Sequence, residues 1–185
     1  MRNLQKRTPG VLLAAFLGLL PATSLAAQPI RLPAGAVLSP DKHFAVFVQA
    51  APGAKISTGL GDAAPNQVWL LDTRTLQTTR LVVSRPSDDM KQVLGGLNSP
   101  TFSANGREVY FLSSAWATSD AVHAVDVRTH TVRFVCDGNT LCVIRQGRYQ
   151  GDLVVNKHKY HPNGGGSYEA DWLVSPSGRE IQVWQ

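Results

Sequence analysis

The sequence predicts an all-β protein, a propeller-like array of about three four-stranded antiparallel blades. Short apolar or alternating runs bounded by Gly, Pro, Asn, Asp and Ser fill the chain from about residue 36 onward. No long stretch with 3.6-residue periodicity follows the N-terminal segment. The strands recur in units of roughly 40–50 residues, which is how a propeller blade looks in sequence. A curved sheet or a small β-sandwich is the alternative that the same strands allow.

The first 26 residues have the pattern of a secretory signal peptide. A basic start precedes the apolar run VLLAAFLGLL (11–20), and small residues follow it. Ser24 and Ala26 fit the minus-three and minus-one positions of a cleavage site, so we expect cleavage after Ala26. An uncleaved anchor is the alternative, but the run is too short for a hydrocarbon core of about 30 Å. The sequence therefore predicts an exported domain, residues 27–185, in the bacterial periplasm or outside the cell, with no transmembrane segment after cleavage.

The charge of the predicted mature chain argues against a nucleic-acid partner. The whole chain carries a formal charge of +5, and residues 1–26 hold three of its 18 basic residues and no acidic one. Cleavage lowers the charge to +2, and no basic block remains on which a nucleic-acid backbone would dock. We therefore expect no nucleic-acid binding.

Two local patterns repeat along the chain. A turn between apolar strands is found at SPDK (39–42), SANG (103–106) and SPSG (175–178). A second element, VWLLDTRT (68–75) and VHAVDVRT (122–129), carries Asp-x-Arg-Thr. Asp often opens a turn because its side chain bonds to the backbone N–H groups that follow. The repeats divide the chain into predicted blades at about 35–83, 99–136 and 140–184.

These motifs resemble the WD40-like (PD40) repeat of the TolB-type β-propeller family, over residues 36–136 and in part over 168–184. The resemblance implies a propeller that serves as a binding or scaffold module, and similar repeats also form the propeller halves of some exported peptidases. Three departures are visible, one of which is that no copy has a complete Thr-Gly hairpin. Lys42 stands where the repeat has Gly, and Ala104-Asn105 stand where it has Pro-Asp.

Three blades would leave two open ends, since a closed propeller has four to eight blades. An open edge strand can pair with another chain. We therefore expect either a homodimer that completes a six-bladed ring or an edge that binds an unknown envelope protein.

The only two cysteines, Cys136 and Cys142, flank an Asp-Gly turn in VCDGNTLCVI. Asp-Gly is a strong hairpin signal, and an even pair of cysteines in an exported protein favours a disulfide. The sequence predicts a disulfide that clamps a hairpin. A free thiol pair and a redox or metal role are the alternatives.

The stretch NKHKYHPNGGGSYEAD holds the one cluster of histidines and carboxylates, namely His158, His161, Glu169 and Asp171. These residue types bind zinc when three or four of them converge. However, alternation along a strand places His158 and His161 on opposite faces, which favours a solvated hairpin. Ser167 lies in GGGSYE, which lacks the last Gly of a nucleophile elbow and has no hydrolase domain around it. We expect no catalysis by Ser167, no bound metal and no cofactor.

Two loops, 51–67 and 113–122, stand at corresponding positions of the first two predicted blades. They should therefore lie on one face, and exposed loops on a rigid scaffold are common binding sites. Trp116, Ser119 and Asp120 are the candidate binding residues, with Trp116 as an aromatic anchor. The alternative for Trp116 is that it covers its own blade.

Together these features predict an exported binding or scaffold module that acts by protein–protein interaction and is not an enzyme. One alternative is a small exported enzyme or metal-binding protein centred on His158 and His161. Another is a secreted inhibitor or immunity-type protein that caps one target.

Overall fold

A computed structural model describes residues 31–184 of the chain. The predicted signal peptide, residues 1–26, lies outside the described residues. The described part consists of strands, turns and irregular segments. In this part of the chain, no helix is long and apolar enough to cross a membrane.

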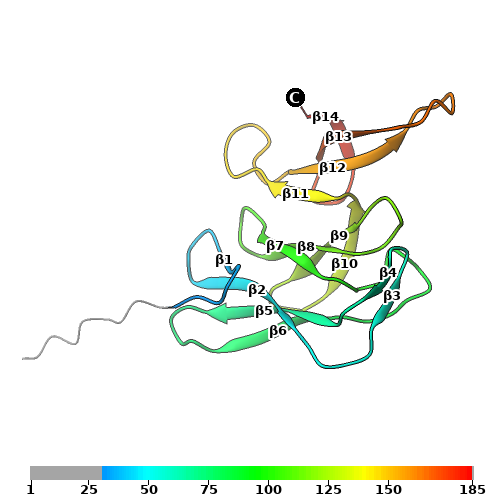
Figure 1. Cartoon of the computed structure of the whole chain (residues 1–185). Coiled ribbons are helices and arrows are strands. Elements are labelled where there is room, and N and C mark those ends of the chain that lie inside the picture. Colours follow the sequence, from blue (N-terminus) through cyan, green and yellow to red (C-terminus); the bar gives the residue numbers. More distant parts are fainter. Residues whose placement is uncertain (1–30, 185) are drawn as a thin grey trace, which may run out of the picture.

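Three four-stranded antiparallel sheets follow one another along the chain, each with its strands in sequence order (Figure 1). We call them blades 1, 2 and 3. Blade 1 consists of β1 (Val37–Leu38), β2 (Phe44–Ala50), β5 (Asn66–Asp72) and β6 (Thr78–Val83). Blade 2 consists of β7 (Asn98–Phe102), β8 (Glu108–Ser113), β9 (Ala121–Asp126) and β10 (Val132–Asp137). Blade 3 consists of β11 (Thr140–Val143), β12 (Leu153–Tyr160), β13 (Ser167–Val174) and β14 (Glu180–Val183).

A two-stranded hairpin of β3 (Ile56–Thr58) and β4 (Gly61–Ala63) is inserted between β2 and β5. Sequence analysis expected only a loop there. The predicted all-β, propeller-like fold class is confirmed, since three consecutive four-stranded meanders stack beside one another (Figure 1).

The repeated serine turn is held by side-chain chemistry that is the same in all three copies. Each serine hydroxyl accepts a hydrogen bond of 3.0 Å from a backbone N–H just beyond the turn: Ser39 from Phe44, Ser103 from Glu108, and Ser175 from Arg179. The first two copies join the first and second strands of their blades, whereas the third joins β13 to β14, the last two strands of blade 3.

Lys42 replaces glycine in the first serine turn without changing its shape. Its φ is 63°, close to the 72° of Gly106 at the same place in the second copy. A non-glycine residue in this left-handed region carries about 1–2 kcal/mol of strain. The departure from the family pattern is therefore accommodated as local strain.

The second repeated turn is held by an aspartate. One carboxylate oxygen of Asp72 accepts hydrogen bonds from the backbone N–H groups of Arg74 and Thr75, at 2.8 and 2.9 Å. In the second copy, Asp126 accepts the equivalent hydrogen bonds from the backbone N–H groups of Arg128 and Thr129, at 2.9 and 2.7 Å. These bonds lower the pKa of both aspartates, so the turns retain charged carboxylates at neutral pH.

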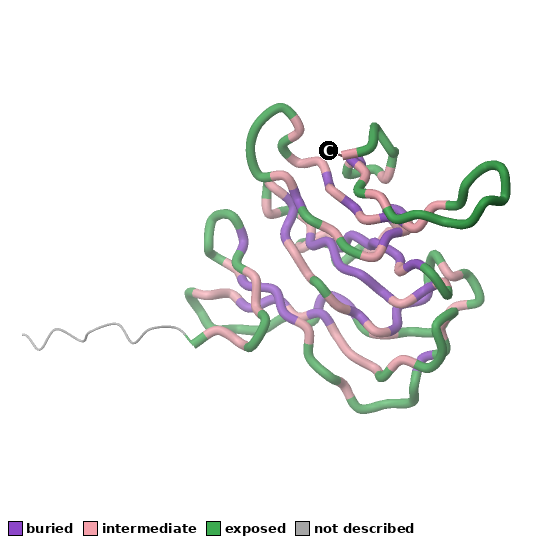
Figure 2. Tube along the Cα trace, turned by 45° about the horizontal axis from the view of Figure 1, so that its top comes forward, coloured by how far each residue is buried: buried purple, intermediate pink, exposed green. Residues whose placement is uncertain are grey.

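The core lies between neighbouring blades rather than within one sheet (Figure 2). Strand β9 shows this best, because every residue from Ala121 to Val125 is at most 1% exposed. Val125 packs in the cluster between blades 1 and 2, whereas Val122 and Ala124 pack between blades 2 and 3. Burying a valine side chain fully stabilises the fold by about 1.5–3 kcal/mol, so the two inter-blade layers hold the array together.

The structure does not support the predicted disulfide, because Cys136 and Cys142 are free thiols on strands of different blades. The Cys136 side chain is buried in the layer between blades 2 and 3, whereas Cys142 is exposed. Asp137-Gly138 does not close a hairpin. It carries the chain from β10 to β11, the first strand of the next blade, and such a crossing uses the same turn residues as a hairpin.

Candidate binding surface at one end of the blades

The connections between the second and third strands of all three blades lie at one end of the molecule, on the right in Figure 1. They comprise residues 51–65, 114–120 and 161–166. The linker between blades 1 and 2, residues 84–97, reaches the same end. We call this side the loop end. Sequence analysis expected the first two loops to share a face, and they do.

The inserted hairpin and the loop of blade 2 are joined directly. The backbone N–H of Gly59 donates a 2.6 Å hydrogen bond to the carbonyl oxygen of Ala115. A side chain at Gly59 would collide with that oxygen, so only glycine permits this approach. Ile56 and Ala115 also share a buried apolar cluster with Val93 of the linker. The three segments therefore form one packed unit.

Trp116 covers its own blade. Its ring meets Phe134 of β10 edge to face, with centroids 6.2 Å apart, and the side chain is half-buried. Ser119 is 8% exposed, and its carbonyl accepts a 2.9 Å hydrogen bond from the N–H of Trp116. These contacts match the alternative weighed for Trp116. The structure does not test whether Trp116 and Ser119 bind a partner, so that role stays a prediction.

Asn139 holds this loop in place. Its side-chain oxygen accepts a 3.1 Å hydrogen bond from the N–H of Asp120, and its amide donates to the carbonyl of Thr118 at 3.2 Å. The N–H of Gly138 donates to the carbonyl of Asp120 at 2.9 Å. The loop is therefore fixed to the connection that leads into blade 3.

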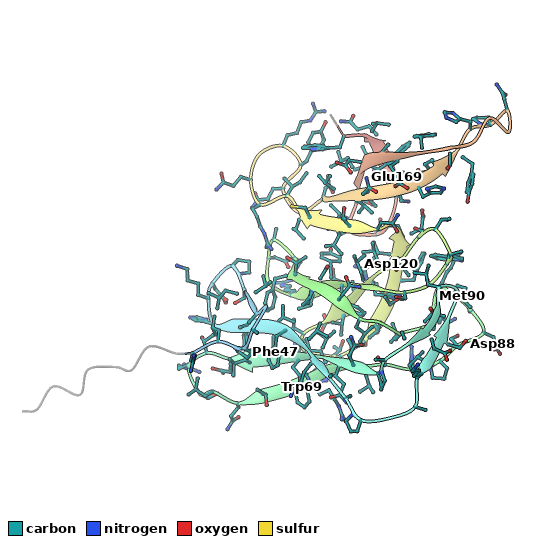
Figure 3. All side chains as sticks on the ribbon, in the orientation of Figure 1. Phe47, Trp69, Asp88, Met90, Asp120 and Glu169 are labelled. Carbon is teal, nitrogen blue, oxygen red and sulfur yellow. The ribbon has the colours of Figure 1, made fainter. Side chains whose placement is uncertain are left out.

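Asp120 is half-buried, and its carboxylate makes no hydrogen bond or ion pair with another residue between 31 and 184. Burial raises the pKa of Asp120 above its usual value. Asp120, Met90 and Asp88 all lie toward the loop end (Figure 3). A positive group that reached the Asp120 carboxylate would gain an ion pair with a partly desolvated charge.

The histidine and carboxylate residues of blade 3 do not converge. Nδ1 of His158 lies 2.6 Å from Oε1 of Glu169, whereas Asp171 accepts a 3.0 Å hydrogen bond from Asn156. His161 instead packs against a tyrosine ring, 4.9 Å between centroids. Over residues 31–184, no group of three or more His, Cys, Asp or Glu side chains is placed to hold a metal ion. The alternative of a metal site built from these four residues is not supported.

A pocket of about 360 Å³, which we call the linker pocket, lies between the linker and the outer half of blade 2. Its wall contains four charged side chains, those of Arg85, Asp89, Lys91 and Arg133. His123 and Phe134 also line it. The linker folds back here through two backbone hydrogen bonds between Arg85 and Leu94, at 2.8 and 3.0 Å.

Sequence analysis missed His123. The side chain is 1% exposed, and neither ring nitrogen has a hydrogen-bond partner among the described residues. Its ring stacks on Phe111 at 5.4 Å and meets Phe134 edge to face at 5.9 Å. Burial lowers the pKa of His123 to about 4; the Arg133 backbone opposes this and the charge of Arg85 adds to it. The sequence did contain a signal: alternate residues of a strand share one face, so His123 was expected on the same face as the apolar residues Ala121 and Val125.

Comparisons with known proteins agree with the architecture. No protein-family model matches the sequence, and no curated protein matches it. Solved structures do match, among them TolB from Acinetobacter baumannii, with a TM-score of 0.51 and 13% identity over 80% of this chain and 31% of that one. The fold is that of TolB-type propeller blades.

Two peptidase structures are also similar to this chain. The β-propeller domain of the trilobed protease from Pyrococcus furiosus, described as having an open velcro topology, gives a TM-score of 0.54 and 13% identity. That match covers 81% of this chain and 42% of the other. An acylaminoacyl peptidase gives 0.50 and 12%, over 80% and 25%. The chain thus spans less than half the length of each match, and identities this low show the fold alone.

Proposed function

We propose that the protein is an exported binding module whose loop end docks a protein partner. The observation that carries the proposal is the rigid assembly of three segments from two blades: the β3–β4 hairpin, the linker and the loop of Trp116 and Asp120. Gly59 bonds to Ala115, and Asn139 fixes Asp120, so these segments lose little freedom when they bind. Preorganisation of this kind lowers the entropic cost of association.

The chemistry of the loop end favours a partner that presents a basic side chain. Asp120 has an unpaired, partly desolvated carboxylate, and Trp116 beside it offers a half-buried aromatic surface. Because the Asp120 carboxylate is already partly removed from water, pairing it with a lysine or arginine requires less further desolvation of the carboxylate than pairing a fully exposed one. The N-terminal sequence pattern supports export, and therefore an envelope protein as the partner.

The case for binding rather than catalysis rests on side-chain geometry. Nucleophilic catalysis requires a base within hydrogen-bond reach of the nucleophile. In the described part of the chain, the Ser167 hydroxyl has no histidine or carboxylate bonded to it, and His158 is bonded to Glu169 instead.

Site-specific photo-crosslinking tests the proposal. A crosslinking residue is placed at exposed Ala117 of the loop end, with a matched probe at exposed Thr75 at the opposite end. Residues 27–185 are then incubated with an envelope extract. We expect one product from Ala117 that the Asp120→Asn variant weakens and that Thr75 does not form. Equal labelling from both positions, or no effect of Asp120→Asn, would contradict the proposal.

The homodimer expected from the open array is proposed as a second assembly. Blades 1 and 3 each have one face that no other blade covers, so two copies could complete a ring of six if the residues that pack on the outer face of blade 1, Leu32 and Ala36, make way for the second copy. Light scattering during size exclusion of residues 27–185 decides this: twice the chain mass supports the ring, and the mass of a single chain excludes it.

A further inference from the structure

We propose that the linker pocket binds an organic carboxylate, a ligand with one anionic head and an apolar body. The pocket adjoins the loop end, since Phe134 in its wall also contacts Trp116, but its residues other than Phe134 are distinct from the Trp116 and Asp120 surface and its ligand is a small molecule. Its volume of about 360 Å³ is within the range of small-molecule sites.

The positive charge of the pocket exceeds the negative charge in its wall, because Asp89 is the one acidic residue beside Arg85, Lys91 and Arg133. Arg85 and Lys91 make no ion pair with any residue from 31 to 184. Arg133, by contrast, is fully engaged, because it donates to both carboxylate oxygens of Glu108 and to the carbonyl of Pro176. Two cations are therefore free to receive an anion.

The carboxylate of Asp89, the acidic group in the pocket wall, is already occupied. One oxygen accepts the backbone N–H of Lys91 at 2.9 Å, and the other accepts the side-chain amide of Gln92 at 3.1 Å. These bonds tie Asp89 into the linker turn. The carboxylate keeps its negative charge, but the two unpaired cations, Arg85 and Lys91, outnumber it and make the open space net positive.

His123 provides an unpaired polar group in the wall of the pocket. It is 1% exposed, and neither ring nitrogen has a partner in good hydrogen-bond geometry among the described residues, although the Arg133 backbone lies close enough to raise the pKa of the ring against the effect of burial. A buried donor without a well-placed partner lowers stability, and a carboxylate oxygen that reached it would remove that penalty. The guanidinium of Arg85 offers the forked geometry that suits the same carboxylate.

The apolar body has its own surface. The ring of Phe134 lies in the wall of the pocket, and the ammonium of Lys91 sits 5.6 Å from the centre of that ring. A ligand ring could pack on Phe134 while its carboxylate meets Lys91 and Arg85. An inorganic anion would use only half of this site.

The test is an NMR titration of purified residues 27–185 at pH 7 with N-acetyl-phenylalanine, its neutral amide, benzoate and inorganic phosphate. We expect saturable shifts at Arg85, Lys91 and the His123 ring with the two carboxylates and none with the neutral amide. Tighter binding of N-acetyl-phenylalanine would identify the C-terminus of a peptide as the source, and tighter binding of benzoate a free acid.

Arg85→Gln should weaken carboxylate binding by roughly tenfold, since hydrogen bonds to charged groups contribute on that order. Arg148→Gln, which removes the same charge from the exposed loop of blade 3, should leave it unchanged. The proposal is overturned if no carboxylate saturates by about 10 mM, or if phosphate binds as tightly as the organic acids. Equal binding by the neutral amide would also overturn it.

Discussion

The ammonium nitrogen of Lys157 lies 2.9 Å from a carboxylate oxygen of Asp137, and this contact joins β12 of blade 3 to the last residue of β10 in blade 2. The same nitrogen lies 2.6 Å from Glu180 of β14. The Lys157 side chain is 2% exposed, whereas those of Asp137 and Glu180 are 41% and 34% exposed. The two sides of the ion pair are therefore unequally buried: the Lys157 ammonium is shielded from water, whereas both carboxylates remain in contact with it.

This asymmetry predicts which deletion costs more. Asp137→Asn combined with Glu180→Gln leaves a buried cation unpaired and should lower the free energy of unfolding by about 3 kcal/mol. Lys157→Met leaves two carboxylates that water can still reach, so it should cost less than about 1.5 kcal/mol. Urea unfolding at pH 7 measures both. An equal loss in the two variants would contradict this account of unequal burial.

His123 predicts a loss of stability at mildly acidic pH. Its pKa is about 4 in the folded protein, because of burial, against 6.5 in the unfolded chain. Between pH 4 and pH 6.5, His123 is therefore protonated in the unfolded chain but neutral in the folded protein. Stability therefore falls as the pH drops from 6.5 to 4, by about 3 kcal/mol in all.

Urea unfolding across that pH window tests the assignment. The His123→Leu variant should lose this part of the pH dependence, whereas His43→Gln, which removes an exposed imidazole, should retain it. A wild-type slope that survives in His123→Leu would assign the acid sensitivity to another group.

The two free cysteines predict unequal reactivity. Burial raises the pKa of the Cys136 thiol to about 12, whereas Cys142 is exposed. Because the thiolate is the reactive form, a thiol reagent at pH 8 should modify one cysteine per native chain and the second only after unfolding. Cys142→Ser should remove the fast reaction and Cys136→Ala should not. If both cysteines were unreactive in the native, non-reduced protein, the result would contradict free thiols and support the disulfide.

The strands themselves follow from local sequence, as β9 illustrates. Alternation and β-branched residues in the repeated element VHAVDVRT (122–129) favour a strand that ends at its aspartate, and β9 runs over Ala121–Asp126. The Asp72 and Asp126 turns were likewise predictable, because an aspartate that bonds to the next backbone N–H groups is a contact within three residues.

What sequence pattern alone could not provide is the position of segments that are distant along the chain. His123 borders a pocket because the linker folds back through Arg85 and Leu94, about 30 to 40 residues earlier. Asp137-Gly138 indicated a turn correctly, but a turn between blades and a turn within a hairpin use the same residues. Sequence pattern therefore placed the two loops on one face correctly but did not indicate the pocket.

Gly59 connects the fold to the proposed binding surface. A methyl group on Gly59 would collide with the carbonyl oxygen of Ala115, so Gly59→Ala should break the 2.6 Å hydrogen bond and separate the hairpin from the blade 2 loop. Forcing atoms into a packed contact costs about 1–3 kcal/mol. We expect a loss of that size in urea unfolding, together with weaker crosslinking from Ala117.

Gly165→Ala is the matched control, because a methyl group there would meet no atom within 4 Å. It should change neither stability nor crosslinking. If Gly59→Ala lowers stability but leaves crosslinking from Ala117 intact, then the hairpin supports the fold without shaping the surface that binds. If both measurements fall together, the packing of Gly59 against Ala115 is what presents the loop end to its partner.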